Sequence, residues 1–108
     1  MAQGIQVVWS NKAIRLLADV AIHLSEHIGK QKANQFQQEL INFIDLHLSQ
    51  FPESASLCRF IRLQERGFRC LVYQKKYIVI YRFEDNTVKV AGVISARRNP
   101  KSFNFLFK

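Results

Sequence analysis

The sequence predicts a single α+β domain over residues 1–108, with the element order β-α-α-β-β-β and a helical hairpin packed on a mostly antiparallel, twisted four-stranded sheet. Three observations predict this class. The chain of 108 residues is long enough for one hydrophobic core but not for two. Apolar residues recur at helical spacing in the first half of the chain. Beyond residue 66 the apolar period shortens to about 2, the period of a strand.

The first half of the chain predicts one strand and two helices. Residues 5–9 are short, β-branched and aromatic, as in a strand. Ser10 then suits the N-cap of a helix whose apolar stripe covers residues 14–28. Gly29 suits the positive φ at the end of that helix. A second apolar stripe over residues 33–44 predicts an antiparallel partner helix after a short link.

The second half predicts three strands joined by two tight turns. After an irregular stretch, the strands are expected over residues 68–73, 77–83 and 87–95. Gln74-Lys75 and Asp85-Asn86 lie at the two reversals, and Asp-Asn tolerates the positive φ of a tight hairpin turn. Two-residue turns at both places would pair Tyr73 with Lys76, Arg69 with Ile80, Phe83 with Val88, and Arg82 with Lys89.

This register divides the side chains of the sheet between two faces. The face expected to bury against the helices is almost entirely apolar and carries Phe68, Cys70, Val72, Tyr77, Val79, Tyr81, Phe83, Val88, Val90 and Ile94. The other face mixes aliphatic with basic residues and carries Arg69, Leu71, Tyr73, Ile78, Ile80, Arg82, Lys89, Ala91, Val93 and Ser95.

Composition excludes several classes of protein. The hydrophobic fraction of 48% argues against a disordered chain. No apolar run approaches the roughly 18 residues of a membrane span, and the N-terminus does not resemble a secretory signal. Cys58 and Cys70 stand apart from any Cys/His cluster, so we expect no structural metal and no cofactor. A cytoplasmic protein with both cysteines reduced, as small apolar fillers, is the simplest interpretation.

The net charge of +8 is concentrated in the second half of the chain. Residues 1–57 hold four basic and five acidic residues, a net of −1, whereas residues 58–108 hold twelve basic and three acidic residues, a net of +9. Such asymmetry favours a binding face over an ordinary solvated surface. The candidate binding residues are Arg59, Arg62, Arg66, Arg69, Tyr73, Arg82, Lys89, Arg97 and Arg98.

Two kinds of partner compete for this basic face. Nucleic acid would meet it through phosphates, with Tyr73 available to stack on a base. An acidic protein segment would meet it through ion pairs and through the exposed aliphatic residues Leu71, Ile78 and Val93.

The three histidines do not predict a catalytic or metal site. His23-Leu24-Ser25-Glu26-His27 matches the H-x-x-E-H string of some zinc peptidases, but such a short string recurs by chance. His23 and His27 fall on the polar side of the first helix, where a solvated role is expected. His47 lies near the end of the second helix, a place where histidine more often caps than catalyses.

Five fragments, in this order and spacing, resemble the RelE/ParE superfamily of toxins, which act in type II toxin–antitoxin systems and plasmid stabilisation. The fragments are Val8-Trp9-Ser10, Phe51-Pro52, Tyr77-Ile78-Val79-Ile80-Tyr81-Arg82, the strand at 88–94, and Arg97-Arg98-Asn99-Pro100. The resemblance runs from about residue 5 to 102. It implies the RelE/ParE-like fold, growth inhibition, and a cognate antitoxin that wraps and neutralises the toxin. Members of the superfamily either cleave mRNA in the ribosomal A site or poison DNA gyrase.

The resemblance favours the gyrase-directed, ParE-like branch over the nucleases. Nuclease members often place arginine after the first tyrosine of the central strand, where this chain has Ile78. Several also carry a late histidine or tyrosine, but here no histidine follows His47 and no tyrosine follows Tyr81. Arginine binds phosphate well but transfers protons poorly. If the chain were nevertheless a ribosome-dependent endoribonuclease, the phosphate-stabilising candidates would be Arg69, Arg82, Arg97 and Arg98.

Two further points stay open at this stage. An inactive or purely regulatory member of the superfamily would keep the fold without toxicity, so enzymatic activity is not assigned. The apolar tail with Phe103, Phe105 and Phe107 either packs back onto the domain or docks an antitoxin or a second copy of the chain, which would make a homodimer.

Overall fold

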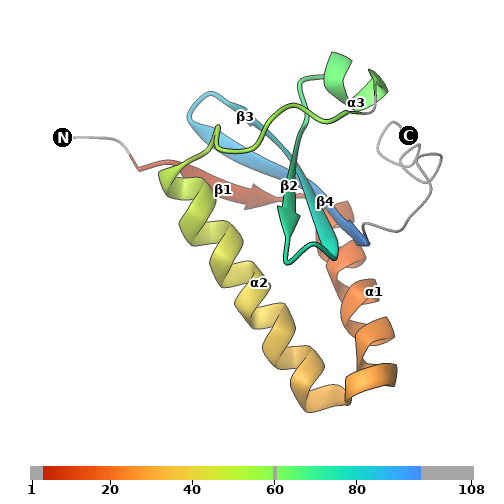
Figure 1. Ribbon diagram of the computed structural model, residues 1–108. Coiled ribbons are helices and arrows are strands. Elements are labelled where there is room, and N and C mark those ends of the chain that lie inside the picture. Colours follow the sequence, from red (N-terminus) through yellow and green to blue (C-terminus); the bar gives the residue numbers. More distant parts are fainter. Residues whose placement is uncertain (1–3, 60, 96–108) are drawn as a thin grey trace.

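A computed structural model describes residues 4–59 and 61–95 and confirms the α+β class (Figure 1). Its elements, in chain order, are β1 (Gln6–Trp9), α1 (Asn11–Ile28), α2 (Lys30–Gln50), α3 (Ile61–Glu65), β2 (Arg69–Tyr73), β3 (Tyr77–Glu84) and β4 (Thr87–Ser95). The predicted order holds, and α3 is an added short helix in the stretch expected to be irregular. In the described part of the chain no helix is both long and apolar enough to cross a membrane.

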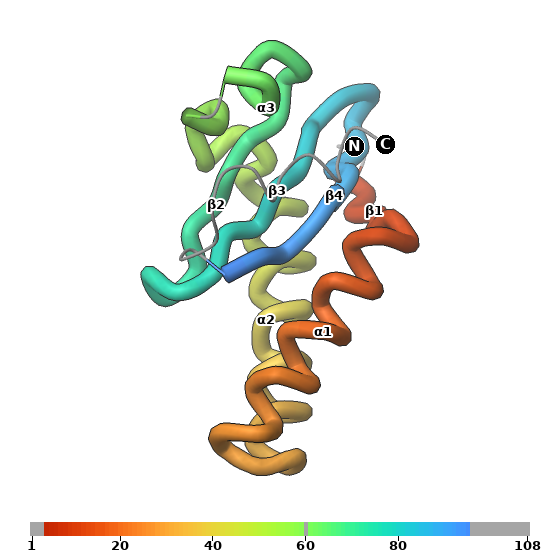
Figure 2. Tube along the Cα trace, turned by 90° about the vertical axis from the view of Figure 1, so that its right-hand side faces the viewer, coloured from red at the N-terminus to blue at the C-terminus, as the bar shows by residue number. Residues whose placement is uncertain are grey.

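The four strands form one sheet with the order β1-β4-β3-β2. β1 runs parallel to β4, and the other two pairings are antiparallel. The α1–α2 hairpin packs on the sheet and extends well beyond it at the end that carries the link between the two helices (Figures 1 and 2). α3 lies at the opposite end of the molecule in both views.

The helical hairpin has the caps that its sequence predicts. Ser10 is extended, and its side-chain oxygen accepts a hydrogen bond from the Ala13 backbone N–H at 3.0 Å. Gly29 has φ of 91° and donates its N–H to the Ser25 carbonyl, which ends α1. Because α2 begins at the next residue, Gly29 alone turns the chain from one helix into the other.

The main core lies between this hairpin and the sheet. Both α1 and α2 contribute buried side chains to this core. The sheet contributes others, including Val79, Tyr81, Val88, Val90 and Val93. Tyr81 is fully buried, and its hydroxyl donates a hydrogen bond to the Pro52 carbonyl oxygen at 2.9 Å. Burial raises the pKa of Tyr81, so this hydroxyl stays protonated and available as a donor.

The predicted two-residue turn between β2 and β3 is wrong. Tyr73 pairs with Tyr77, so the turn has three residues, and Gln74 and Lys75 both adopt positive φ, at 53° and 60°. The extra residue shifts every side chain of β2 to the opposite face. The stretch Gln74-Lys75-Lys76 contains no glycine or asparagine to mark the turn length. Packing decides it instead, because the shift buries Tyr73 against two phenylalanines of α2.

The second hairpin follows the prediction up to a β-bulge. Asp85 and Asn86 have φ of 52° and 59° and form the two-residue turn, with Arg82 opposite Lys89 and Phe83 opposite Val88. Farther along, Tyr81 pairs with Val90 but Ile80 pairs with Gly92, which leaves Ala91 as an extra residue. Beyond the bulge the faces exchange. Val93 therefore packs toward the helices and Ile94 toward the other face, the reverse of the prediction.

Cys58 and Cys70 form a disulfide, so the expectation of two reduced cysteines is wrong for this structure. Cys58 belongs to the segment 53–59, here called the strap, which follows α2 and runs along the outer edge of β2. Leu57 bridges to Arg69, the Cys58 N–H donates to the Phe68 carbonyl at 3.0 Å, and the Cys70 N–H donates to the Ser56 carbonyl at 3.3 Å. The sequence spacing alone does not show that the strap returns beside β2.

We predict that Ile44→Ala lowers the free energy of unfolding by about 2–5 kcal/mol, because the Ile44 side chain is fully buried in the main core. The matched control is Leu46→Ala on the same helix. Leu46 is 63% exposed, so its truncation should cost less than about 0.5 kcal/mol. Urea denaturation followed by circular dichroism measures both values. Equal losses in the two variants would contradict the placement of the core.

We predict that the disulfide stabilises the fold by about 3 kcal/mol, as expected for a closed loop of this length. Adding a reductant should therefore lower the denaturation midpoint of the wild-type chain. The double variant Cys58→Ala/Cys70→Ala should show the lower midpoint with or without reductant. A wild-type midpoint that does not respond to reductant would show that the bridge contributes nothing.

Candidate interaction surface

The face of the sheet turned away from α1 and α2, here called the outer face, has an apolar centre of its own. Ile80 and Ile94 are buried there together with Cys58 of the strap and Leu63 of α3. Phe68, Ile78 and Ala91 pack around this cluster and are partly buried. Cys58 of the strap and α3 therefore cover part of the outer face, and α3 is anchored there by Leu63.

A basic cluster lies on the outer face near the β3–β4 turn. The Arg82 guanidinium carbon stands 5.2 Å from the centre of the Phe68 ring. Its Nη2 lies 3.0 Å from the Glu84 carboxylate, and the Lys89 Nζ lies 3.2 Å from the same carboxylate oxygen. The hydrogen bond from Lys89 and the charge of Arg82 lower the pKa of Glu84. Two cations therefore share one anion. We call Arg82 and Lys89 the outer basic pair.

Three more sequence-predicted arginines lie on α3 or next to it. Arg82 Nη1 donates to the Arg66 carbonyl oxygen at 3.4 Å, which places the end of α3 next to β3. Arg62 belongs to α3 and Arg59 to the strap, and the side chains of Arg59, Arg62 and Arg66 are all exposed. The structure thus gathers five of the nine predicted binding residues at the α3 end of the molecule.

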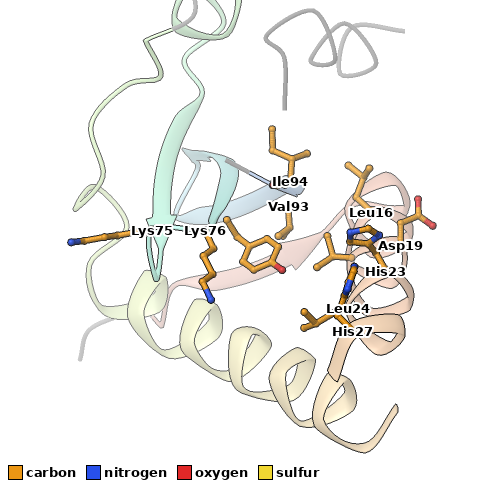
Figure 3. A pocket seen from close by; sticks show the side chains of 12 residues that line it. Leu16, Asp19, His23, Leu24, His27, Lys75, Lys76, Val93 and Ile94 are labelled. Carbon is orange, nitrogen blue, oxygen red and sulfur yellow. The ribbon is translucent and has the colours of Figure 1, made fainter. Parts of the chain in front are cut away.

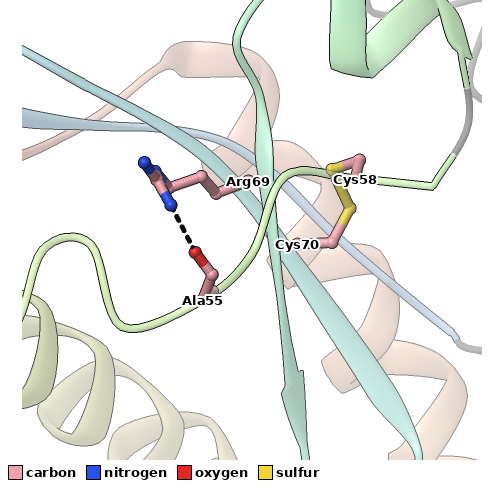
Figure 4. Close-up of a disulfide and its surroundings, with 4 residues drawn as sticks. All are labelled: Ala55, Cys58, Arg69 and Cys70. Carbon is pink, nitrogen blue, oxygen red and sulfur yellow. Dashed lines mark hydrogen bonds between the residues drawn. A yellow bond between two sulfur atoms is a disulfide. The ribbon is translucent and has the colours of Figure 1, made fainter.

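Arg69 does not belong to this surface, contrary to the prediction. It pairs with Tyr81 in the sheet and so lies on the helix side of β2. Its Nη1 donates to the Ala55 carbonyl oxygen at 2.6 Å (Figure 4). Its Nη2 lies 3.4 Å from the Glu53 carboxylate. Arg69 therefore fastens the strap from one face of β2 while the disulfide at Cys70 fastens it from the other.

The predicted exposure of Tyr73 on the basic face is also wrong. Only 9% of its surface is exposed, and its ring packs against Phe43 and Phe36 with centroids 5.0 and 6.0 Å away. A base cannot stack on a ring that is already covered. Leu71 and Val93, expected as exposed aliphatic contacts, also face the helices, whereas Ile78 does lie on the outer face. The remaining predicted residues, Arg97 and Arg98, and the tail with Phe103, Phe105 and Phe107 lie outside the described residues.

All three histidines stand on the two long helices. His23 and His27 are exposed on α1, with ring centroids 5.0 Å apart, and His23 lies 3.9 Å from Glu26. His47 stacks on Phe43, and its Nε2 lies 3.0 Å from the Ser54 hydroxyl, so it joins the end of α2 to the strap. Across residues 4–59 and 61–95, no group of three metal-ligating side chains gathers.

The described outer face therefore offers cations that can meet an acidic or phosphate-rich partner. Arginine and lysine stay charged near neutral pH, and they can bind carboxylates or phosphates. No described histidine joins them there to act as a general acid or base. Sequence reasoning identified the outer basic pair because the second hairpin turn was predicted correctly, and it misplaced Arg69 and Tyr73 because the first was not.

Comparison with known proteins agrees with the fold. Residues 7–100 match the family model described as the ParE toxin of the type II toxin–antitoxin system parDE. A structure of the chromosomal ParDE toxin–antitoxin system from P. aeruginosa is similar with a TM-score of 0.73 and 16% identity, covering 87% of this chain and 98% of that one. The toxin–antitoxin complex RelBE2 from Mycobacterium tuberculosis gives a TM-score of 0.62 and 16% identity, covering 86% of this chain and 99% of that one. No curated protein sequence matches the chain.

Proposed function

The chain belongs to the ParE toxin family of type II toxin–antitoxin systems, and we propose that it inhibits growth by binding DNA gyrase through the basic end of its outer face. A cognate antitoxin is its partner, as the two solved structures, which come from toxin–antitoxin systems, support. In this proposal the toxin acts by binding and performs no chemical step of its own.

The outer basic pair is the observation that carries the proposal. Arg82 and Lys89 lie on the outer face near the β3–β4 turn and share the single carboxylate of Glu84. Arg82 also donates to the Arg66 carbonyl at the end of α3, and Arg59, Arg62 and Arg66, on or next to α3, are exposed. A surface of this kind attracts an acidic or phosphate-rich partner over several ångströms and speeds its association. It needs no acid–base group.

The competing hypothesis is ribosome-dependent mRNA cleavage. It would need several phosphate-stabilising cations close to one reacting phosphate, together with a group that moves a proton. Of its four candidates, Arg69 and Arg82 lie on opposite faces of the sheet, and Arg69 is engaged by the strap. This separation supports the binding proposal over the nuclease.

The test is to induce the chain alone in bacterial cells and to follow the incorporation of labelled thymidine and labelled methionine. We expect DNA synthesis to fall first, because blocked gyrase halts replication before translation. If protein synthesis falls first, mRNA cleavage replaces gyrase binding as the function. If neither falls while folded protein accumulates, the chain is a non-toxic, regulatory member of the family.

A pair of variants in the same experiment tests the surface itself. Arg82→Gln/Lys89→Gln removes the outer basic pair and should raise the protein level needed for growth arrest about tenfold, equivalent to 1.4 kcal/mol of binding free energy. The matched control, Lys30→Gln/Lys32→Gln, removes the same charge from exposed positions at the start of α2. The control should arrest growth like the wild type. An equal loss in both variants would mean that total charge, and not this surface, determines toxicity.

A further inference from the structure

A pocket of about 720 Å³ lies between the second half of α1 and the strand ends beside the β2–β3 turn (Figure 3). One wall is α1, which presents His23, Leu24 and His27. The turn with Lys75 and Lys76 lines the facing side, and the amine of Lys75 extends away from α1 (Figure 3). Its volume falls in the range of ligand-binding pockets and suits several apolar side chains of a partner.

The floor of the pocket is apolar because α1 extends beyond the end of the sheet. The apolar stripe of α1 is covered at Ala13 and Leu17, which are 0% and 3% exposed. The same stripe continues to Val20 and Leu24, which line the pocket and are only partly buried. Apolar surface that continues a core stripe into solvent is typical of a site for another chain.

The rim of the pocket is mainly basic. Lys75 and Lys76 are exposed, and neither forms an ion pair with a described acidic residue. His23 and His27 stand across from them, and Asp19 is the only acidic residue among the described residues that line the pocket. A segment with carboxylates beside apolar side chains therefore complements this site.

We propose that the pocket holds an acidic segment of the cognate antitoxin, whose apolar side chains pack on Val20 and Leu24 and whose carboxylates pair with Lys75 and Lys76. This inference rests on the proposed function for the existence of that partner. Two other possible occupants are basic, like the rim of the pocket, and would be repelled by it. Residues 96–108 of the chain itself, which follow Ser95 at the pocket, include four basic and no acidic residues. A second copy of the chain would bring a net charge of +8.

This site is distinct from the outer basic pair. β3 and β4 run antiparallel, with Tyr77 opposite Ser95 at one end and Arg82 opposite Lys89 near the other. Tyr77 and Ser95 line the pocket, and Arg82 lies five positions farther along β3 than Tyr77, about 17 Å at the usual rise. The antitoxin segment and the target therefore have separate contact sites on the same sheet.

The experiment measures binding of a fluorescent 18-residue amphipathic peptide, with leucine on one helical face and glutamate on the other, to the full chain. We expect Lys75→Glu/Lys76→Glu to weaken binding at least tenfold. The matched control, Lys30→Glu/Lys32→Glu, makes the same change of charge outside the pocket and should change binding less than twofold. Leu24→Asp should also weaken binding tenfold, whereas Ile22→Asp, at an exposed position of α1 outside the pocket, should not.

Several results would overturn this assignment. One is that the wild-type chain does not bind the peptide. Another is that it binds a peptide with lysine in place of glutamate equally well. A third is that the pocket variants and the control variants lose the same amount of binding affinity. Amide resonances that shift around Arg82 and Lys89, instead of around residues 75–77, would place the acidic segment elsewhere. A concentration-dependent rise in mass that Lys75→Glu/Lys76→Glu abolishes would assign the pocket to a second copy. None of these results affects growth arrest by the chain alone, so the proposed function is tested separately.

Discussion

The register of the three antiparallel strands is the constraint on which both surfaces of this toxin depend. A shift of one residue turns every side chain of a strand to the other face of the sheet. The three-residue turn after Tyr73 directs Arg69 toward the helices and Cys70 toward the outer face. The two-residue turn at Asp85 and Asn86 keeps Arg82 and Lys89 together on that outer face. The lengths of the two turns therefore determine that Arg82 and Lys89 lie on the outer face and that Arg69 lies on the helix side of the sheet.

The strap, fastened along β2, gives the outer face a defined shape. It is held along β2 by the disulfide on the outer face and by Arg69 on the helix face, and the Tyr81 hydroxyl fixes the corner at Pro52 where it begins. Beside the strap, Leu63 of α3 is buried in one cluster with Ile80, and Arg82 donates a hydrogen bond to the carbonyl of Arg66 at the end of α3. Arg69, which was predicted from the sequence as a binding residue, thus supports the binding surface from the opposite face of β2.

The regular parts of this fold were predictable from sequence, because local signals agree with tertiary packing there. The Ser10 cap, the Gly29 link and the Asp85-Asn86 turn each have a residue type that determines the backbone locally. The β2–β3 turn has no such residue, and burial of Tyr73 sets its length. At the bulge, Gly92 beside Ala91 is a local signal, since an isolated glycine inside a strand pattern often marks a bulge. For the same reason the outer basic pair was predictable, while the disulfide and the pocket beside Lys75 and Lys76 required three-dimensional proximity between distant segments.

In the proposed function, this ParE family member acts by binding gyrase, with the outer basic pair as contact, and not by cutting RNA. The most direct measurement is DNA supercoiling by purified gyrase, with purified toxin added in increasing amounts and a translating ribosome assay run in parallel. We expect supercoiling to stop as toxin approaches the gyrase concentration, while mRNA on the ribosome stays intact. Unchanged supercoiling together with cleaved mRNA would contradict this proposal.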